Sequence, residues 1–176
     1  AFASGADIGE LGTVELGAGG RGTAVRSPRA GSAQPATTLA IGKPVIAMIH
    51  GYCLGGGLMV AMEADLRVAA DDATFGIPAG RLGAGYPFES VQRLVALVGP
   101  EWASSILLAG TRLDAAGAQR IGLIGEVVPK AELEPRVVEL AGQIAANAPL
   151  SLAASKASIA AALELAGSSQ AAARCL

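Results

Sequence analysis

The sequence has little of what binding to nucleic acids, metals or redox partners requires. Aromatic residues make up 3% of its 176 residues and charged residues 16%, and the net charge is −2 with no block of Lys and Arg. Nucleic-acid recognition depends on clustered basic residues, so we expect no nucleic-acid partner. The one histidine, His50, and the distant Cys53 and Cys175 have none of the spacings typical of zinc or redox sites. We therefore expect neither a metal nor a redox cofactor.

The sequence also lacks long apolar runs and a targeting segment. Charges or glycines interrupt every apolar stretch well before the length of a membrane span, so we expect no membrane partner. The first residues, AFASGADIGE, have no basic region ahead of an apolar one, which argues against a signal peptide. With so few cysteines, this favours a reduced, cytoplasmic setting. Because the chain begins at Ala1, inside a motif described below, we expect that an N-terminal part is missing.

What the sequence has in abundance is small and aliphatic residues. Hydrophobic residues make up 52% of the chain, which at this length predicts one domain of ordinary size with its own core. Small side chains allow close backbone packing, which favours helices laid on a sheet. Residues 11–38 differ, because Gly, Ala, Ser, Pro and Arg dominate there without a period of 2 or 3.6. That composition predicts an irregular or poorly ordered loop.

Strand and helix patterns alternate from residue 41 onward. Pro44 to Ile49 is a short apolar run typical of buried parallel strands, Gly57 to Ala64 follows as a helix, and Leu66 to Ala70 is a second strand. Further elements are predicted as helices over 88–98 and 100–108, a helix capped by Asp114, a strand over 124–128, and helices over 131–147 and 150–165. This alternation indicates an α/β fold with right-handed crossovers.

Three consecutive glycines, Gly55 to Gly57, lie between a predicted strand and a predicted helix. Backbone N–H groups at a helix start carry partial positive charge, and glycine lets a ligand approach them without a Cβ in the way. The stretch HGYCLGGGL lacks both the Lys-Ser/Thr ending of a phosphate loop and the G-x-G-x-x-G spacing. It favours a hole for a small developing anion, such as a carbonyl oxygen. Tight packing of helix on strand stays open as the alternative.

The glycine-rich stretch, IAMIHGYCLGGGLMVAMEADL at residues 46–66, strongly resembles the signature of the crotonase, or enoyl-CoA hydratase/isomerase, superfamily. AFASGADI at 1–8 resembles the family's first oxyanion loop, and GKPVIAMIHG at 42–51 resembles the strand that leads to the second. ATFGIPAGRLGAGYP at 73–87 resembles the active-site segment that follows, and residues 91–129 resemble the scaffold. Residues 11–38 and the last dozen residues fit the family poorly.

The resemblance implies the crotonase-like fold, a spiral of β-β-α repeats that we expect over 1–130. The C-terminal helical region, over 131–176, would pack in a trimer, so a homotrimer or a dimer of trimers is expected. The implied ligand is an acyl-CoA thioester, with coenzyme A as part of the substrate and no other cofactor.

The resemblance also implies which residues form the active site. The backbone N–H groups of Ala6 and Gly56 match the two oxyanion donors that polarise the thioester carbonyl and stabilise an enolate. The remaining matches are substrate-binding positions: Ala3, Asp7, Ile8, Gly55 and Tyr86. The Tyr86 hydroxyl is expected to donate a hydrogen bond to the substrate, or the side chain simply packs.

Two positions depart from the pattern of a hydratase in this family, which uses two glutamates to handle the water and the proton. Met59 stands where the first glutamate is expected, and Ala79, directly after Pro78, stands where the second is expected. Neither side chain can act as an acid or a base. The sequence therefore argues against hydration by the two-glutamate route.

Glu89, in YPFES, is the best replacement for the missing acid/base. In an apolar pocket the pKa of its carboxyl would rise and the group could shuttle a proton. Alternatively, an acid in the first turn of a helix only stabilises that helix. Glu63 and Asp65 are interpreted as structural carboxylates. Cations considered for contact with CoA phosphates are Arg67, Arg81 and Lys156.

Two functions stay open at this point. The first is an acyl-CoA enzyme of fatty acid metabolism, a hydratase or an isomerase, which forms an enolate at Ala6 and Gly56 with Glu89 as acid/base. The second is a non-catalytic acyl-CoA-binding relative or an inactive fragment, which the apolar residues Met59 and Ala79 favour.

Overall fold

A computed structural model of the chain describes residues 41–83 and 85–166, apart from the side chains of residues 164–166. The predictions for the loop over 11–38 and for Ala3, Ala6, Asp7 and Ile8 lie outside the described residues.

The described chain alternates strands and helices, as the sequence predicts. Its strands are β1 (Ile46–Ile49), β2 (Tyr52–Leu54), β3 (Leu66–Ala70), β4 (Thr74–Gly76), β5 (Leu113–Asp114) and β6 (Glu126–Val128). Its helices are α1 (Gly56–Glu63), α2 (Ala79–Leu82), α3 (Phe88–Leu108), α4 (Ala115–Arg120), α5 (Leu133–Ala145) and α6 (Pro149–Ala166), with a 3-10 turn at Lys130–Glu132. The class is α/β.

The strands form two three-stranded sheets, one in the order β1-β3-β6 and the other in the order β2-β4-β5. β1 pairs with β3 in parallel, Ile46 opposite Leu66, and β2 pairs with β4 in parallel, Tyr52 opposite Thr74. Each strand of a β-β-α repeat therefore pairs with the equivalent strand of the next repeat. Only β4 and β5, among the described strands, run antiparallel. This stacking of repeats is the spiral that the resemblance implies.

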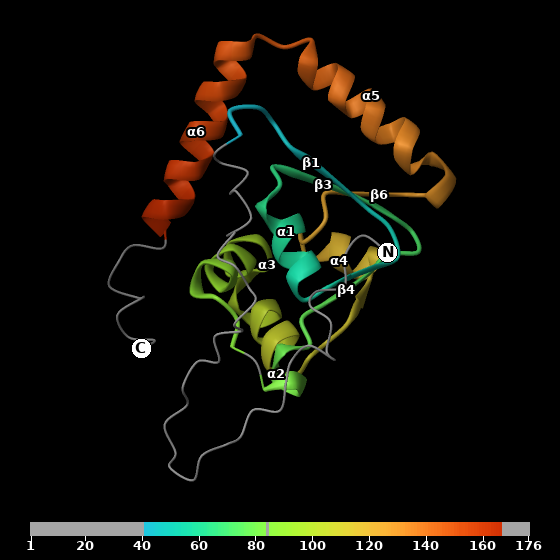
Figure 1. Cartoon of the computed structure of the whole chain (residues 1–176), viewed down its shortest axis with the longest axis vertical. Helices are drawn as coiled ribbons and strands as arrows, with labels where there is room; N and C mark the ends of the chain where they lie inside the picture. Colours follow the sequence, from blue (N-terminus) through green and yellow to red (C-terminus); the bar gives the residue numbers. More distant parts are fainter. Residues whose placement is uncertain (1–40, 84, 167–176) are drawn as a thin grey trace, which may run out of the picture.

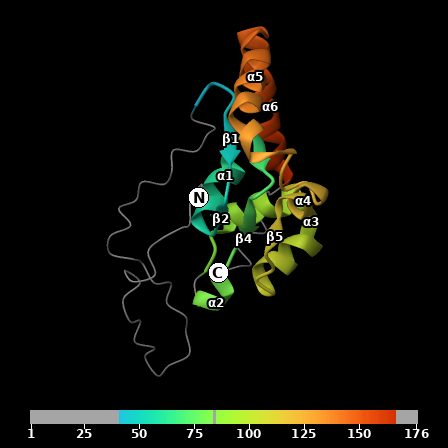
Figure 2. The same cartoon turned by 90° about the vertical axis from the view of Figure 1, so that its right-hand side faces the viewer.

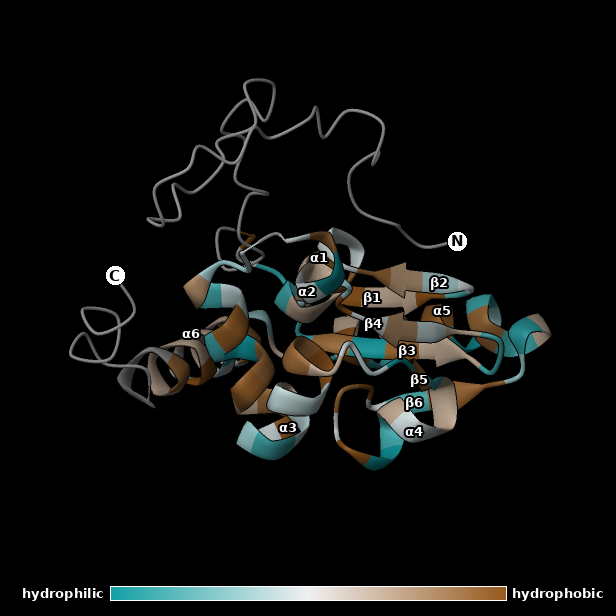
Figure 3. Ribbon diagram, turned by 90° about the horizontal axis from the view of Figure 1, so that it is seen from below, coloured by the Kyte–Doolittle hydropathy of each residue, from teal (hydrophilic) through white to brown (hydrophobic). Residues whose placement is uncertain are grey.

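Small and aliphatic side chains fill the core, as the composition predicts. α1 packs against α3 and β2, and α4 packs against β4, β5 and β6 (Figure 1). Phe75, Ile49 and Leu58 have no exposed surface, and many alanines lie among them. Burying one such large side chain contributes about 1.5–3 kcal/mol. Figure 3 shows apolar residues along much of the strand layer.

The C-terminal helices α5 and α6 lie at one end of the molecule and α2 at the other, in both Figure 1 and Figure 2. α5 contacts β1 and β3 through a small second cluster around Val68, Ala70 and Leu133. No single helix of the described chain has the length and apolar composition to cross a membrane, although residues 130–163, a helix pair bent by 106°, meet both criteria together. Most of this helix pair is exposed.

The sequence predictions differ from the structure mainly in the short elements. β3 has the predicted bounds, and α1 begins one residue early. Gly99, with a φ of 74°, breaks α3 where Gly99-Pro100 was predicted to separate two helices. Asp114 caps α4 as predicted, since its carboxylate accepts the Gly117 N–H at 2.7 Å. The sequence did not predict β2, β4, β5 or α2.

Candidate active site at the Gly55–Gly57 turn

The turn between β2 and α1 is fixed by backbone hydrogen bonds. Gly55 has a φ of 52° and a ψ of −117°, a conformation that only glycine adopts without strain. Its N–H donates to the Gly76 carbonyl oxygen at 2.9 Å, at the end of β4. Its own carbonyl oxygen accepts the Met59 N–H at 3.1 Å, which is the first bond of the helix. The chain therefore passes from strand to helix within one residue.

Gly56 is the first residue of α1, so its N–H has no acceptor within the helix. No other group in the described part of the chain accepts a hydrogen bond from it. This N–H lies at the positive end of an eight-residue helix, where negative charge is stabilised. Gly56 is therefore the first available backbone donor at this helix start, while the Gly55 and Met59 N–H groups are already used by the fold.

Tyr86, in the segment between α2 and α3, contacts the same turn. Its hydroxyl donates to the Gly55 carbonyl oxygen at 3.1 Å. Burial, with a smaller contribution from Cys53, raises the pKa of Tyr86, so the hydroxyl keeps its proton. The sequence predicted Tyr86 as a donor to the substrate or as a packing residue. In the structure its hydroxyl donates its hydrogen bond to the protein backbone.

Cys53 is fully buried in β2, directly before this turn. Burial raises the pKa of its thiol to about 12, so the group stays protonated at neutral pH. The described surroundings therefore do not activate this thiol as a thiolate.

Met59 and Ala79, at the two positions where the resemblance implies glutamates, border this region from different helices. Met59 is a half-buried residue of α1, and Ala79 is the first residue of α2 and is half-buried as well. Ala79 packs against the core cluster. Both positions therefore contribute apolar surface.

Glu89 lies in the first turn of α3 and is exposed. A carboxylate at this place interacts favourably with the helix start, and α3 has no side-chain cap of its own. The described residues do not enclose this carboxyl in an apolar pocket. Its role as an acid/base stays a prediction.

Two cations that were considered for CoA phosphates are used inside the fold. The Lys156 ammonium donates to the Asp65 carboxylate at 2.7 Å and to the Lys43 carbonyl oxygen at 2.9 Å, and Lys156 is 9% exposed. Arg67 donates to the Ala64 and Leu123 carbonyl oxygens at 2.8 and 2.9 Å. Arg81 is exposed and stays a candidate.

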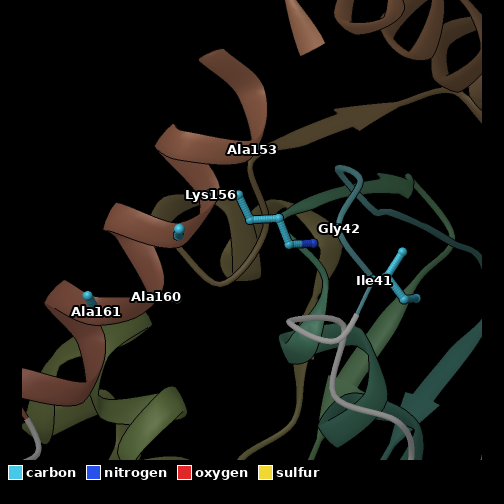
Figure 4. A pocket seen from close by; sticks show the side chains of 7 residues that line it. Ile41, Gly42, Ala153, Lys156, Ala160 and Ala161 are labelled. Atoms are coloured by element: carbon cyan, nitrogen blue, oxygen red, sulfur yellow. The ribbon is translucent and has the colours of Figure 1, made fainter. Parts of the chain in front are cut away.

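Asp65 is structural, as the sequence predicts. The same carboxylate oxygen that binds Lys156 also accepts the Val45 N–H at 2.7 Å. Lys156 lines a hollow of about 350 Å³ between α6 and residues 41–42. Figure 4 shows its side chain reaching from α6 toward Gly42. Ala153, Ala160 and Ala161 line the same hollow from α6.

Sequence reasoning missed the groups that hold the two ends of α1. Gly76 supplies the carbonyl oxygen that fixes Gly55, and Arg93 donates to the Met62 carbonyl oxygen at 3.0 Å at the other end of the helix. The one available signal for Arg93 was its place beside the apolar stripe of α3. No cluster of three or more His, Cys, Asp or Glu side chains suited to a metal ion occurs among residues 41–83 and 85–166.

Comparison with known proteins gives a consistent set of relatives. A family model described as enoyl-CoA hydratase/isomerase matches residues 1–175. A crotonyl-CoA hydratase of Syntrophomonas wolfei is 44% identical over 118 residues, which are 67% of this chain and 45% of the relative. A short-chain-enoyl-CoA hydratase of Clostridium acetobutylicum is 41% identical over 117 residues, 66% of this chain and 45% of the relative. The chain spans about half the length of the curated relatives it matches.

Solved structures agree on the fold. An enoyl-CoA hydratase/isomerase family protein from Hyphomonas neptunium superposes with a TM-score of 0.65 at 44% identity, covering 67% of this chain and 45% of the other. An enoyl-CoA hydratase/carnithine racemase from Magnetospirillum magneticum superposes with a TM-score of 0.69 at 33% identity, covering 76% and 50%.

Proposed function

The chain belongs to the enoyl-CoA hydratase/isomerase family, the crotonase superfamily, and from that premise we propose that it binds an acyl-CoA thioester and stabilises the enolate oxygen formed from it. The observation that supports this most directly is the Gly56 N–H, which starts α1 without an acceptor in the described chain. A preorganised donor of this kind contributes about 2.7–4 kcal/mol to stabilising an oxyanion.

The second donor in this proposal is the Ala6 N–H, with Ala3, Asp7 and Ile8 beside it as substrate-binding positions. These assignments rest on the resemblance of residues 1–8 to the family's first oxyanion loop. Coenzyme A is then part of the substrate, and no separate cofactor takes part. The proposal includes a cytoplasmic setting. It also includes a homotrimer or a dimer of trimers, and size measurement in solution would test this oligomeric state.

The proton transfer in this proposal falls to Glu89. Met59 and Ala79 have no ionisable group, so neither can take or give the proton at the substrate carbon. Glu89 is exposed at the start of α3, and an exposed carboxylate reaches a bound substrate only if that substrate extends to the first turn of α3. This favours an isomerase, which moves one proton, over a hydratase that must also activate water.

A second function is favoured by the same pair of residues. With Met59 and Ala79 lining the region, the chain would bind an acyl-CoA and turn nothing over. Binding of crotonyl-CoA without conversion of either a 2-enoyl or a 3-enoyl thioester would support this alternative. Activity that disappears in Glu89→Gln while binding is kept would exclude it.

The test of the proposed function is the absorbance of the conjugated thioester, followed with crotonyl-CoA and with a 3-enoyl-CoA. Gly56→Pro removes the N–H at the first helical position, where proline is well tolerated, and should lower turnover about 100-fold or more. Gly56→Ala keeps the N–H and serves as the control, with circular dichroism confirming that both variants fold. Equal turnover in Gly56→Pro and in the unchanged protein would refute the role of this donor.

A further inference from the structure

We propose that Tyr86 is a positioning residue for the oxyanion donor, because its hydroxyl holds the Gly55–Gly56 peptide in the orientation that directs the Gly56 N–H at the thioester oxygen. This inference rests on the proposed function and assigns Tyr86 to the protein side of the site. It differs from the role in substrate binding that the sequence predicted for Tyr86.

The argument begins with the peptide unit itself. The Gly55 carbonyl and the Gly56 N–H belong to one planar peptide, and in a trans peptide they point in opposite directions. A hydrogen bond that fixes the carbonyl oxygen therefore fixes the direction of the N–H on the other side. The Tyr86 hydroxyl makes such a bond at 3.1 Å.

This peptide needs a restraint because glycines flank it. Gly55 occupies a positive φ, and Gly56 and Gly57 follow it, so side-chain sterics do little to limit rotation about this peptide. The bond from Met59 to the Gly55 oxygen belongs to the first turn of α1, and helix ends fray. Tyr86 lies 31 residues further along the chain, so its bond does not depend on that turn.

The same bond also makes the Gly56 N–H a better donor. A hydrogen bond accepted by an amide carbonyl polarises the whole amide, which strengthens its N–H. The effect is largest away from water, and Tyr86 is half-buried there. The hydroxyl has one hydrogen to donate, and it donates it in the hydrogen bond to Gly55. Donation to a substrate would require this bond to break.

The test compares Tyr86→Phe with Tyr52→Phe in the full chain. Both changes remove one hydroxyl and keep the ring, and Tyr52 is 56% exposed on β2, beside the same turn. The first measurement needs no ligand: amide NMR and hydrogen exchange of Gly56. Tyr86→Phe should shift the Gly56 amide resonance and speed its exchange, and Tyr52→Phe should change neither. A Gly56 amide unchanged in Tyr86→Phe would overturn the inference, whether or not any acyl-CoA binds.

The second measurement uses bound crotonyl-CoA and reads the stretching frequency of its thioester carbonyl. The unchanged protein should lower this frequency, and Tyr86→Phe should lower it less, with turnover reduced about fivefold and little change in KM. A merely structural tyrosine would lower the melting temperature and leave the carbonyl frequency of the folded complex unchanged, which would overturn the inference. If the unchanged protein binds no acyl-CoA, the proposed function fails, and the Gly56 amide alone decides whether Tyr86 positions this peptide.

Discussion

The β-β-α core and the C-terminal helix pair are both rich in alanine and aliphatic residues, yet they bury these residues to very different extents. In the core, side chains such as Ile49 and Leu58 have no exposed surface. On α5 and α6, apolar side chains such as Val138 and Ile159 are more than 60% exposed. The small cluster around Leu133 and the bond from Arg136 to Glu126 attach α5 to the sheet, and the Lys156–Asp65 pair attaches α6 to the residue before β3. The comparison teaches that apolar composition alone does not tell which helices are buried.

The largest expected effect comes from making the same substitution in both regions. Ile49→Ala removes a fully buried side chain from β1 and should lower the free energy of unfolding by about 2–5 kcal/mol, because it leaves a cavity. Ile159→Ala on α6, where the side chain is 63% exposed, should change it by less than about 0.5 kcal/mol. Urea unfolding curves measure both values. Similar losses would mean that α6 is buried in solution.

A smaller effect is expected from the buried ion pair that attaches α6. Lys156→Met removes the partner of Asp65, whose carboxylate is 27% exposed, and should cost about 1–3 kcal/mol, less than for a fully buried pair. Hydrogen exchange should show the loss mainly in α6. The control is Lys130→Met, which breaks the exposed pair with Asp72 and should have little effect. Loss of protection throughout the core in Lys156→Met would contradict this picture.

The smallest expected effect is a loss of stability in α5 at acidic pH. Hydrogen bonds from Arg136 on α5 lower the pKa of Glu126 on β6 below its ordinary value of 4.5. Because the folded pKa is the lower one, the pair stabilises the fold fully above pH 4.5, and this stabilisation is lost as the pH falls through the folded pKa. The protection of α5 amides, measured against their intrinsic exchange rate at each pH, should therefore fall in acid before that of the core. Arg136→Gln should remove this pH dependence, and an unchanged acid response in that variant would refute it.

Patterns of adjacent residues were enough to predict the longer elements. β3 was predicted with its bounds because LRVAA, apolar apart from Arg67, is closed by Asp71 and Asp72. β2 and β4 were missed because strands of three residues are too short to show a period of 2. Strands this short depend on their parallel partners in the next repeat, which a local pattern does not reveal.

In the candidate site, too, features set by adjacent residues could be predicted and contacts between distant residues could not. The glycine run predicted the turn from backbone chemistry at a helix start, whereas the choice of Gly56 as the donor came from the family resemblance. The bond from Tyr86 to Gly55 joins residues far apart in sequence, and nothing near Tyr86 indicates it. Lys156 was considered for CoA phosphates because of its positive charge, and a local pattern does not reveal its burial, which depends on Asp65, 91 residues earlier.

The stacking of repeats has a consequence for how this chain acquires its site. Gly55 belongs to the first described repeat, whereas the carbonyl of Gly76 and the hydroxyl of Tyr86 that hold it come from the second. Every strand pairing among the described strands spans at least one helix, so none of these sheets can begin as a local hairpin. The first repeat alone therefore lacks the groups that fix its Gly55–Gly57 turn. We expect the geometry at Gly56 to form in the same cooperative step in which the two repeats pack together.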